Sequence, residues 1–380
     1  MEHIKLKDIA TLITKGTTPT SLGFDFEKEG INFVKIESIT EDGNFIENKF
    51  AHISNECNEK LNRSKLQEND ILFSIAGAIG RVAVVNKEIL PANTNQALAI
   101  IRIPEGMYEY RFLEYVLKSN YVAKQFEKKK QGVAQLNLSL QDIGELLIPR
   151  VELEKQKYIV EVFEKLEKNI SCRKLQLEKL DELVKARFVE LFGDRYTNDK
   201  NWENKPLYEC ADFYNGKAHE QVVDENGEYI LVTSRCIASD ITDYRRTNAL
   251  LFPLKTNDIA MVMSDVPNGR ALAKCILIDE NDKYTLNQRI CCLRNYSFNP
   301  IFFYYLLNRH EYFLSFNDGN AQTNLRKDDL LACNIIMPPI ELQNQFAAFV
   351  EQTDKSKLAV QKSLDKLELL KKALMQKYFE

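Results

Sequence analysis

The chain has 380 residues, of which 44% are apolar and 28% are charged, with only 14 Gly and 10 Pro. This composition excludes a disordered chain, and the length exceeds what one hydrophobic core usually organises, so two or more domains are expected. The formal net charge is −4, and residues 1–150 and 194–338 hold 19 and 16 basic residues against 20 acidic residues each. That balance excludes the strongly basic surface with which a protein binds phosphate backbones unaided.

The first half of the chain begins with short β-rich runs, among them INFVKI (31–36), RVAVV (81–85) and ALAIIRI (97–103). An amphipathic helix, YRFLEYVLKS (110–119), follows them. The Pro-containing segment LIPRVELEKQ (147–156) then leads into a long helical tail. Alternating and helical periodicities in one segment predict an α+β domain.

The second half repeats this plan. LQENDILFSIAGAIGRVAVV (66–85) aligns with LKTNDIAMVMSDVPNGRALAKCIL (254–277), and TNQALAII (94–101) aligns with LNQRICCL (286–293). Further matches join 132–143 to 319–330, 147–156 to 336–345 and 177–192 to 364–379, with an offset of 187 to 192 residues throughout. A repeat in constant order predicts two α+β domains of one architecture, related by a pseudo-two-fold axis. The predicted segments are a first head at 1–150, a first helical spacer at 151–193, a second head at 194–338 and a second helical spacer at 339–380.

Both tails carry heptads, although polar residues interrupt the apolar seam in each: Arg173 and Arg187 in the first, and Thr353, Lys357 and Lys371 in the second. The predicted seam residues are Ile159, Phe163, Leu166, Ile170, Leu177, Leu180, Val184 and Leu191, with Phe346, Val350, Val360, Leu364, Leu367, Leu374 and Tyr378. An apolar stripe must be buried, so we expect the two helices to pair as an antiparallel coiled coil, each roughly 60 Å long. The alternative is that each helix packs on its own domain. The polar linker at 193–207 returns the chain after the first helix.

Two diverged copies, each followed by a long helix, with NDILFSIAGAIGRVAVV, TNQ, a Pro-containing exit and a C-terminal LKKALMQKYF, resemble the Type I restriction-modification specificity subunit family. The resemblance implies two target recognition domains that read a bipartite, asymmetric site in double-stranded DNA, held apart by conserved helical spacers. It also implies partners: two methyltransferase subunits that methylate adenine N6 with S-adenosylmethionine, and restriction subunits that move along DNA and cut it. ATP and Mg are expected in those partner subunits, and no cofactor is expected in this chain.

Catalytic motifs do not accompany this pattern. The sequence has no [DN]PP[YF] loop, no GxGxxG turn and no GxxxxGK[ST] phosphate loop, and its four histidines are dispersed. The eight cysteines form no CxxC pair and no cluster at zinc-ligand spacing, and the acidic pair Asp328-Asp329 suits a helix start, so no metal site is expected. We therefore expect a non-catalytic chain.

The sequence also bears on location. The charged N-terminus MEHIKLKD lacks the apolar core of an export signal, and runs such as ILFSIAGAI (71–79) are far shorter than the roughly 20 residues that span a bilayer. These features predict a cytoplasmic chain with reduced thiols and no membrane partner.

Candidate DNA contacts are polar loop residues near the repeated landmarks, because Arg, Lys, Asn and Gln read base edges, and hydroxyls and cations bind phosphates. In the first head they are Lys15, Thr17, Thr18, Lys35, Ser74, Arg81, Lys128, Lys129, Lys130 and Gln131. In the second they are Lys217, His219, Arg235, Arg245, Arg246, Asn268, Arg270 and Arg326.

These candidates carry different alternatives. The lysines at 128–130 can equally be a solvated helix end. Arg81 and Arg270 recur in both copies, which favours phosphate contact or a structural role over discrimination between sequences. Asn95-Gln96 and Asn287-Gln288 also recur and favour a structural turn. Residues that differ between the copies, such as Arg235, Arg245 and Arg246, are better placed to discriminate.

Because neither head is basic, we expect the chain alone to bind DNA weakly and its methyltransferase partners to add most phosphate contacts. Two other interpretations stay open at this point. One is the specificity subunit of a different restriction arrangement. The other is a coiled-coil adaptor that binds proteins rather than DNA.

Overall fold

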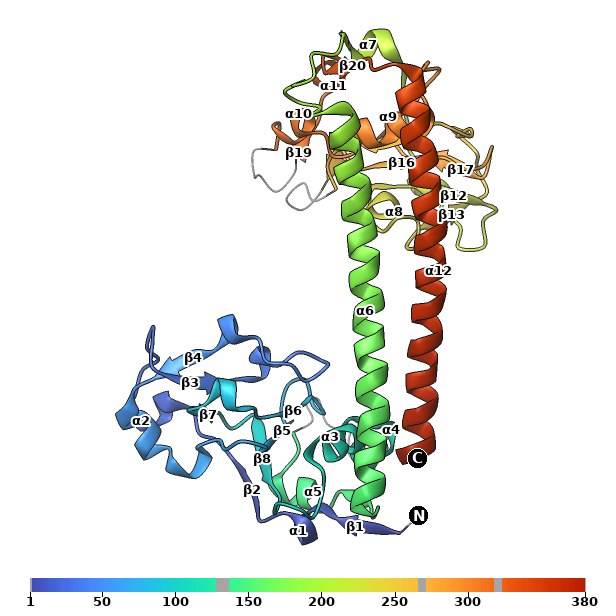
Figure 1. Cartoon of the computed structure of the whole chain (residues 1–380). Coiled ribbons are helices and arrows are strands. Elements are labelled where there is room, and N and C mark those ends of the chain that lie inside the picture. The colour runs from blue at the N-terminus through green and yellow to red at the C-terminus, as the bar shows by residue number, and fades with distance from the viewer. Residues whose placement is uncertain (1, 128–136, 266–270, 318–322, 380) are drawn as a thin grey trace. The chain divides into compact units, whose positions relative to one another are not determined.

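The computed structural model describes residues 2–127, 137–265, 271–317 and 323–379. The chain forms two compact units. Unit 1 comprises Met1–Lys174 and Lys362–Glu380, and unit 2 comprises Leu175–Gln361. Each unit therefore contains one α+β head, the beginning of one long helix and the end of the other (Figure 1).

Unit 1 contains three small sheets. A four-stranded antiparallel sheet has the order β2 (Leu12–Lys15), β8 (Leu98–Arg102), β5 (Ile71–Ser74) and β6 (Val82–Val84). A three-stranded sheet has the order β4 (Ala51–Ile53), β3 (Ile31–Val34) and β7 (Ala92–Thr94), with β3 and β7 parallel. Strand β1 (His3–Lys5) pairs antiparallel with β9 (Leu147–Pro149). The helices are α1 (Leu6–Ile9), α2 (Asn55–Lys60), α3 (Tyr110–Lys118), α4 (Asn120–Glu127), α5 (Leu140–Gly144) and the start of α6 (Leu153–Phe192).

Unit 2 has the same sheets in the same orders. Its four-stranded sheet runs β11 (Asp212–Asn215), β18 (Ile290–Arg294), β14 (Ile259–Val262) and β16 (Cys275–Leu277). Its three-stranded sheet runs β13 (Arg245–Thr247), β12 (Tyr229–Val232) and β17 (Tyr284–Leu286), and β10 (Asn204–Pro206) pairs with β20 (Asn334–Ile336). Unit 2 also has a two-stranded ladder of β15 (Ser264–Asp265) and β19 (Thr323–Asn324), which has no counterpart among the described residues of unit 1. The helices are α7 (Leu207–Cys210), α8 (Ser234–Ala238), α9 (Pro300–Leu307), α10 (Glu311–Leu314), α11 (Lys327–Leu331) and α12 (Ile340–Phe379).

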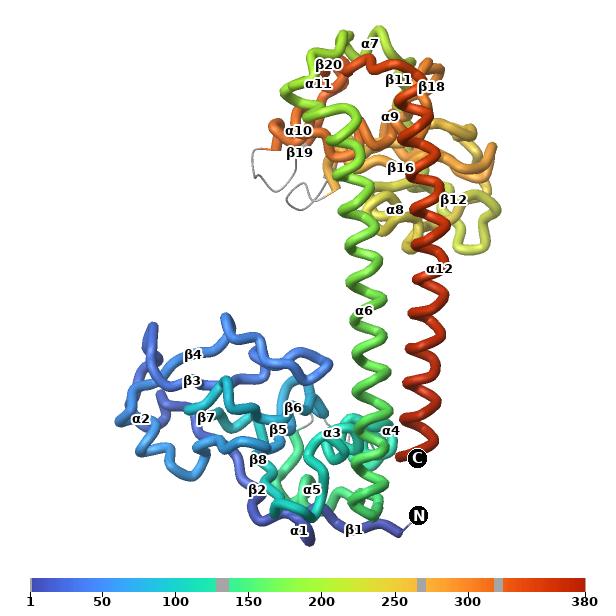
Figure 2. Tube along the Cα trace, in the orientation of Figure 1, coloured from blue at the N-terminus to red at the C-terminus, as the bar shows by residue number. Residues whose placement is uncertain are grey.

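The registers of the two units match residue by residue. Ile71 pairs with Ile101 in unit 1, as Ile259 pairs with Leu293 in unit 2. Figure 2 traces the chain through both heads. The predicted fold, two α+β copies of one architecture, is confirmed.

Each four-stranded sheet is buried on both faces. In unit 1 the alternate residues Ile71 and Phe73 face a core with α3, whereas Leu72 and Ile100 face a second core with the three-stranded sheet. Because successive side chains of a strand point to opposite faces, two cores require a continuous apolar run such as ILF at 71–73. Unit 2 repeats this division, with Met261 on one face and Ala260 on the other.

A buried ion pair recurs at the same place in both units. The Asp70 carboxylate is fully buried and accepts two hydrogen bonds from Arg102, each of 2.7 Å. Asp258 accepts from Arg294 in the same way, at 2.8 and 2.6 Å. The preceding residues, Asn69 and Asn257 (φ 68° and 72°), are left-handed, which Asn tolerates better than most residues. The shared Asn-Asp dipeptide is therefore a turn followed by a buried anchor.

Helices α6 and α12 run antiparallel within each unit. In unit 1, Phe163 contacts Phe379 with ring centroids 5.8 Å apart, and Lys371 Nζ lies 2.8 Å from Glu167 Oε1. In unit 2, Phe188 and Phe346 lie 5.4 Å apart. The predicted pairing is confirmed. The helices also pack on the heads, as shown by the contact of Phe163 with Tyr115 at 4.8 Å, so each unit combines both packing modes.

The predicted seam residues are buried or partly buried. The buried members are Ile159, Phe163, Leu166, Ile170, Val184, Phe346, Val350, Val360 and Leu364. The partly buried members are Leu177, Leu180, Leu191, Leu367, Leu374 and Tyr378.

The polar interruptions of the seam differ in their surroundings. Lys357 pairs with Asp181 at 2.6 Å, and Thr353 is buried with its hydroxyl donating to the Phe349 carbonyl. Arg187 pairs with Glu190 and lies over the Phe349 ring, whereas Arg173 is exposed. Within the described residues, no helix is both long enough and apolar enough to cross a membrane.

Candidate nucleic-acid interface

A repeated turn positions the candidate contacts in each head. Between β7 and β8, the Asn95 Oδ1 atom accepts from the Ala97 amide at 3.1 Å, and Asn287 accepts from Arg289 at the equivalent place. A Cβ atom on Gly16 would lie 1.8 Å from the Thr94 carbonyl oxygen, so this position requires glycine. The asparagine of each Asn-Gln pair thus has the structural role that its recurrence favours, and the following glutamine is exposed.

Four candidates of unit 1 gather around this turn. Lys15 is exposed at the end of β2, and the partly buried Thr17 follows it. The Thr18 hydroxyl donates to the Gln96 side chain. Lys35 follows β3, whose Val34 carbonyl accepts from Thr94, and its ammonium lies 4.1 Å from the centre of the Phe26 ring. Chain segments that are distant in sequence therefore supply hydroxyl and ammonium groups around one turn.

Two predicted contacts are wrong for this structure, and a third, Arg81, has hydrogen bonds within the head. Ser74 is fully buried, and its hydroxyl donates to the Ala76 carbonyl. His219 is also fully buried, with its ring nitrogens bonded to the Lys217 carbonyl and the Thr285 hydroxyl. The Arg81 guanidinium donates to the carbonyls of Ile36 and Ile39, at 3.1 and 2.7 Å. Arg81 therefore has the structural role that its recurrence allowed, and its Nη1 group is engaged within the head.

Unit 2 has a hollow of about 280 Å³ at the end of its three-stranded sheet. Three arginines line it: Arg235 from α8, Arg245 at the start of β13 and Arg289 at the turn before β18. Arg235 pairs with Asp243 at 2.5 Å. Sequence reasoning missed Arg289, although it differs between the copies just as Arg235 does, since Ala97 stands in its place in TNQALAII.

The other candidates of unit 2 have mixed surroundings. Lys217 is exposed after β11, and Arg326 is exposed at the start of α11. Arg246 donates to the carbonyls of Gly227 and Glu228, both at 3.2 Å, so part of its donor capacity is used within the head. The predicted contacts Lys128, Lys129, Lys130, Gln131, Asn268 and Arg270 lie outside the described residues.

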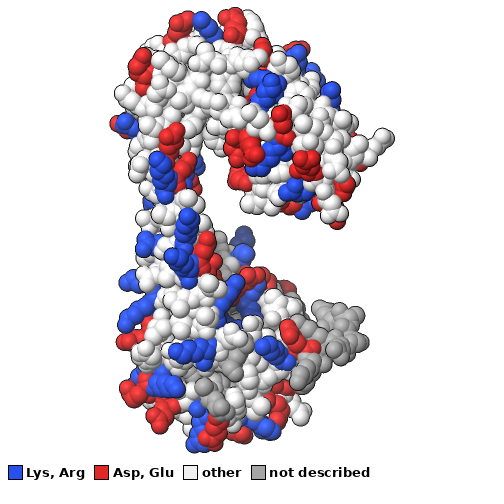
Figure 3. Space-filling model, turned by 90° about the vertical axis from the view of Figure 1, so that its right-hand side faces the viewer, with Lys and Arg blue, Asp and Glu red and all other residues white. Residues whose placement is uncertain are grey.

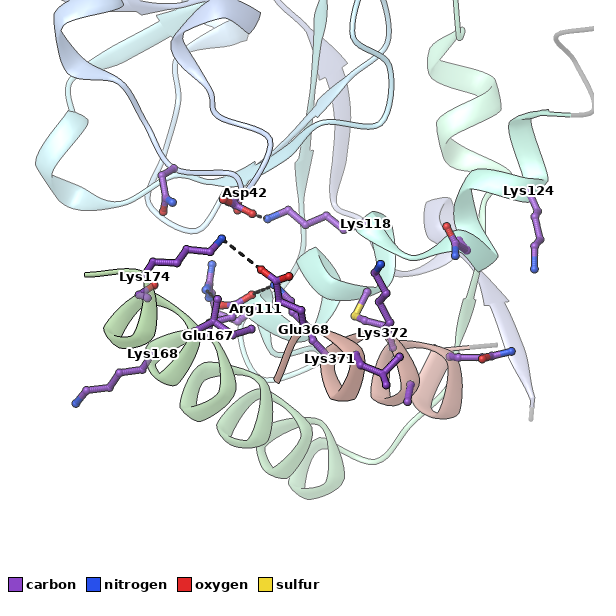
Figure 4. A pocket seen from close by; sticks show the side chains of 18 residues that line it. Asp42, Arg111, Lys118, Lys124, Glu167, Lys168, Lys174, Glu368, Lys371 and Lys372 are labelled. Atoms are coloured by element: carbon purple, nitrogen blue, oxygen red, sulfur yellow. Dashed lines mark hydrogen bonds and ion pairs between the residues drawn. The ribbon is translucent and has the colours of Figure 1, made fainter. Parts of the chain in front are cut away.

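Unit 1 contains a second, larger hollow of about 970 Å³, where the Asp42 loop, α3 and α4 face α6 and α12 (Figure 4). Its cations are mostly paired with acids. Lys118 lies 2.5 Å from Glu114 and donates to the Asp42 carbonyl, and Lys174 lies 3.6 Å from Glu368. Seven lysine and arginine side chains line the hollow against three acids, so these pairs leave it with a net positive charge.

Charged side chains of both signs are interspersed over the visible face of each unit (Figure 3). Among the residues that the structure describes, no three His, Cys, Asp or Glu side chains are grouped as metal ligands. The arrangement offers hydrogen-bond donors at loop ends rather than a set of reactive groups.

Three comparisons agree on the kind of protein. Residues 1–182 and 199–369 match the family described as Type I restriction modification DNA specificity domain. A similar curated protein is the Type I restriction enzyme EcoBI specificity subunit of Escherichia coli, 34% identical over 134 residues, which are 34% of this chain. The chain spans about a quarter of that relative, 27% of its length.

Solved structures are similar over the whole chain. A chain from a study of complex assembly and conformational transition of the type I R-M system has a TM-score of 0.67 at 16% identity, covering 100% of this chain and 97% of that chain. The S subunit of the Type I restriction-modification system of M. genitalium has a TM-score of 0.52 at 16% identity, with coverages of 100% and 96%. These likenesses show a shared fold. With the family match over both halves, they establish that the chain belongs to the Type I restriction-modification DNA specificity domain family.

Proposed function

We propose that this chain is the DNA-specificity subunit of a Type I restriction-modification complex. It reads a bipartite, asymmetric site in double-stranded DNA, one half with each head, and it carries no catalytic centre of its own. Two methyltransferase subunits supply S-adenosylmethionine chemistry, and restriction subunits supply ATP- and Mg-dependent movement and cutting. All of these act in the cytoplasm.

The observation that carries the proposal is that the two units have the same strand register but different side chains in their loops. Corresponding strands of the two units pair residue for residue, so corresponding loop positions are held by equivalent frames. The residues at those positions differ, as Lys35 and Thr233 do after β3 and β12. Base edges are distinguished by side-chain donors and acceptors, so equal frames with unequal side chains favour two unlike half-sites.

The charge distribution supports DNA binding in which the methyltransferase partners contribute part of the phosphate contacts. With a net charge of −4 and heads in which acids equal or outnumber bases, the chain neutralises few phosphates by itself. Phosphate neutralisation supplies most sequence-independent affinity. Methyltransferase partners that contact the backbone would supply what the chain lacks.

Exposed apolar side chains on the long helices support partner docking. In unit 2, Leu175, Leu183 and Leu358 are 53%, 49% and 57% exposed. In unit 1, Leu369 and Leu370 are 69% and 47% exposed. Large apolar residues grouped along a helix typify surfaces that another protein covers.

Selection from random-sequence duplexes tests the proposal. The chain alone, the methyltransferase encoded beside it, and their co-purified complex are each incubated with the same pool, and the retained DNA is sequenced. The complex is expected to enrich one motif of two unlike halves at a fixed gap, and either protein alone should enrich none at physiological salt. Tight, specific binding by the chain alone would contradict the proposal that its partners contribute most phosphate contacts. A complex that enriches no motif would contradict DNA reading and favour the adaptor.

A further inference from the structure

The three positions that hold arginine in the hollow of unit 2 have equivalents in unit 1 that hold no arginine. In β12, Leu231 pairs with Arg245 on one side and with Thr285 on the other. In β3, Phe33 pairs with Ala51 and Asn93 in the same way. Arg245 of unit 2 is therefore equivalent to Ala51 of unit 1.

The other two arginines follow the same register. Arg289 directly precedes β18, and Ala97 directly precedes β8, each two residues after the turn asparagine. Arg235 is the second residue of α8, and Glu37 is the second residue of the 3₁₀ turn Ile36–Ser38 that follows β3. Equivalent frames thus present three arginines in unit 2, and one acid and two alanines in unit 1.

Two of these arginines, Arg245 and Arg289, have no side-chain partner among the described residues. Arg235 is held by Asp243. Arg245 and Arg289 are exposed, and among the described residues neither guanidinium has a hydrogen bond or an ion pair. Each can therefore present its planar fork of donors outward without breaking an existing contact.

The lining of the hollow suits the edge of a base pair. Thr233, Ser234 and Asn287 add hydroxyl and amide groups beside the arginines. Its two acids are engaged, since Asp243 holds Arg235 and Glu220 accepts from Gln288 at 2.9 Å. Three arginines against two acids leave one net positive charge in the hollow.

We propose that Arg245 and Arg289 read guanine in the half-site of unit 2, and that unit 1 reads its half-site without arginine at these positions. The inference rests on the proposed function and adds the base and the residues. A guanidinium fork matches the O6 and N7 acceptors of guanine in the major groove, whereas alanine offers no donor and a carboxylate only accepts. The arginines of this hollow therefore give the two heads different base preferences, although their backbones are alike.

Methylome mapping with single variants tests this inference. The chain and variants Arg245→Ala and Arg289→Ala are each co-expressed with the neighbouring methyltransferase, and N6-methyladenine is mapped across the host genome. Each variant is expected to lose roughly 10- to 100-fold of its discrimination at one G·C position. Both positions should lie in the same half of the motif, and the other half should stay intact as an internal control.

Further variants separate base reading from charge. Lys255→Ala removes an exposed cation of unit 2 outside the hollow and is expected to leave both halves unchanged. Arg245→Lys and Arg289→Lys keep the charge but lose the fork, so they should be relaxed at the same positions as the alanine variants. Co-purification with the methyltransferase shows that each variant is folded. If an alanine variant does not co-purify, the lysine variant at the same position is used to test base reading.

Two results would overturn the inference: no change of motif in either alanine variant, or a uniform loss across both halves. The second would indicate phosphate contacts. A wild-type chain that directs no bipartite motif would instead refute the proposed function, so the two failures are distinguishable.

Discussion

At the scale of single residues, each head is anchored by a carboxylate that is buried with its arginine. Asp70 also accepts the Gln67 amide at 2.7 Å, and Asp258 accepts the Lys255 amide at the same distance. Each carboxylate thus ties the turn before a central strand to the neighbouring strand. Removing one member of such a pair leaves the other charge without its partner.

Replacing Asp70 by Ala is expected to lower the free energy of unfolding by about 3–5 kcal/mol, because Arg102 loses its buried partner. The matched control is Glu68→Ala, which removes an exposed acid that lies 3.4 Å from Lys87. That change should cost less than about 1 kcal/mol. Chemical denaturation followed by circular dichroism measures both, and equal losses in the two variants would argue against the anchoring role.

His310 gives unit 2 a dependence on pH. Burial, with the nearby Arg195 guanidinium, lowers the pKa of His310 from 6.5 to about 4. His310 is 2% exposed, and its Nδ1 atom caps α10 by accepting from the Tyr312 amide. Between pH 6.5 and 4 the unfolded chain binds a proton here that the folded chain excludes. Stability is therefore full above pH 6.5 and falls as the pH drops towards 4.

We expect His310→Asn to reduce this acid loss by up to about 3 kcal/mol, since asparagine keeps a helix-capping acceptor and does not titrate. The melting temperature of both proteins, measured from pH 7.5 to 4, tests the expectation. Parallel curves for the two proteins would show that His310 does not contribute to the pH dependence.

At the scale of elements, aromatic rings fasten the long helices to the heads. Phe346 of α12 is fully buried against Phe188 and Phe192 of α6, and its ring lies 5.3 Å from that of Tyr305 in α9. Phe163 has the corresponding role in unit 1, between Tyr115 and Phe379. Helix pairing and head packing therefore meet at one ring in each unit.

Phe346→Ala is expected to destabilise unit 2 by about 3–5 kcal/mol, the cost of an unfilled aromatic cavity. Leu358→Ala on the same helix changes an exposed side chain and should shift stability by less than about 0.5 kcal/mol. Denaturation midpoints compare the two variants. A small effect of Phe346→Ala would mean that the helix pair is fastened elsewhere.

The exposed leucines should matter for association rather than for folding. Leu183→Ser with Leu358→Ser is expected to leave the melting temperature of the chain nearly unchanged and to weaken its complex with the methyltransferase at least tenfold. Titration calorimetry with the purified partner measures the affinity, and alanine at the buried Phe346 is the contrasting variant. An unchanged affinity would place the partner on another surface.

Sequence patterns predicted the elements better than the individual contacts. The shared Asn-Asp and Asn-Gln pairs located corresponding turns, because turn geometry restricts residue type locally. Ser74 and His219 were misplaced, because their burial depends on distant partners. Ser74 belongs to a strand covered on both faces, and His219 is bonded to Thr285, which pairing of β12 with β17 brings into place.

Long-range side-chain contacts could not be predicted from the sequence either. Arg195 lies in the predicted linker, yet its guanidinium donates to the carbonyls of Tyr305, Leu306, Asn308 and Arg309 at the end of α9. Nothing in the local sequence marks a side chain that caps a helix more than a hundred residues away. Arg289 could have been found by comparing the copies position by position, because the difference between Arg289 and Ala97 is visible in the sequence.

At the scale of the whole molecule, the two heads share one strand register but carry different loop side chains. Duplication supplies two equivalent frames, and loop substitutions give each frame its own preference without altering the core. Each long helix contributes one part of its length to unit 1 and the other part to unit 2.

We propose that this chain determines which DNA sites its methyltransferase modifies. The most direct measurement maps N6-methyladenine in cells that express the neighbouring methyltransferase with this chain and, separately, without it. We predict methylation at one bipartite motif of two unlike halves, present only when the chain is expressed. An identical methylation pattern in both strains, or a motif that does not require the chain, would contradict the account.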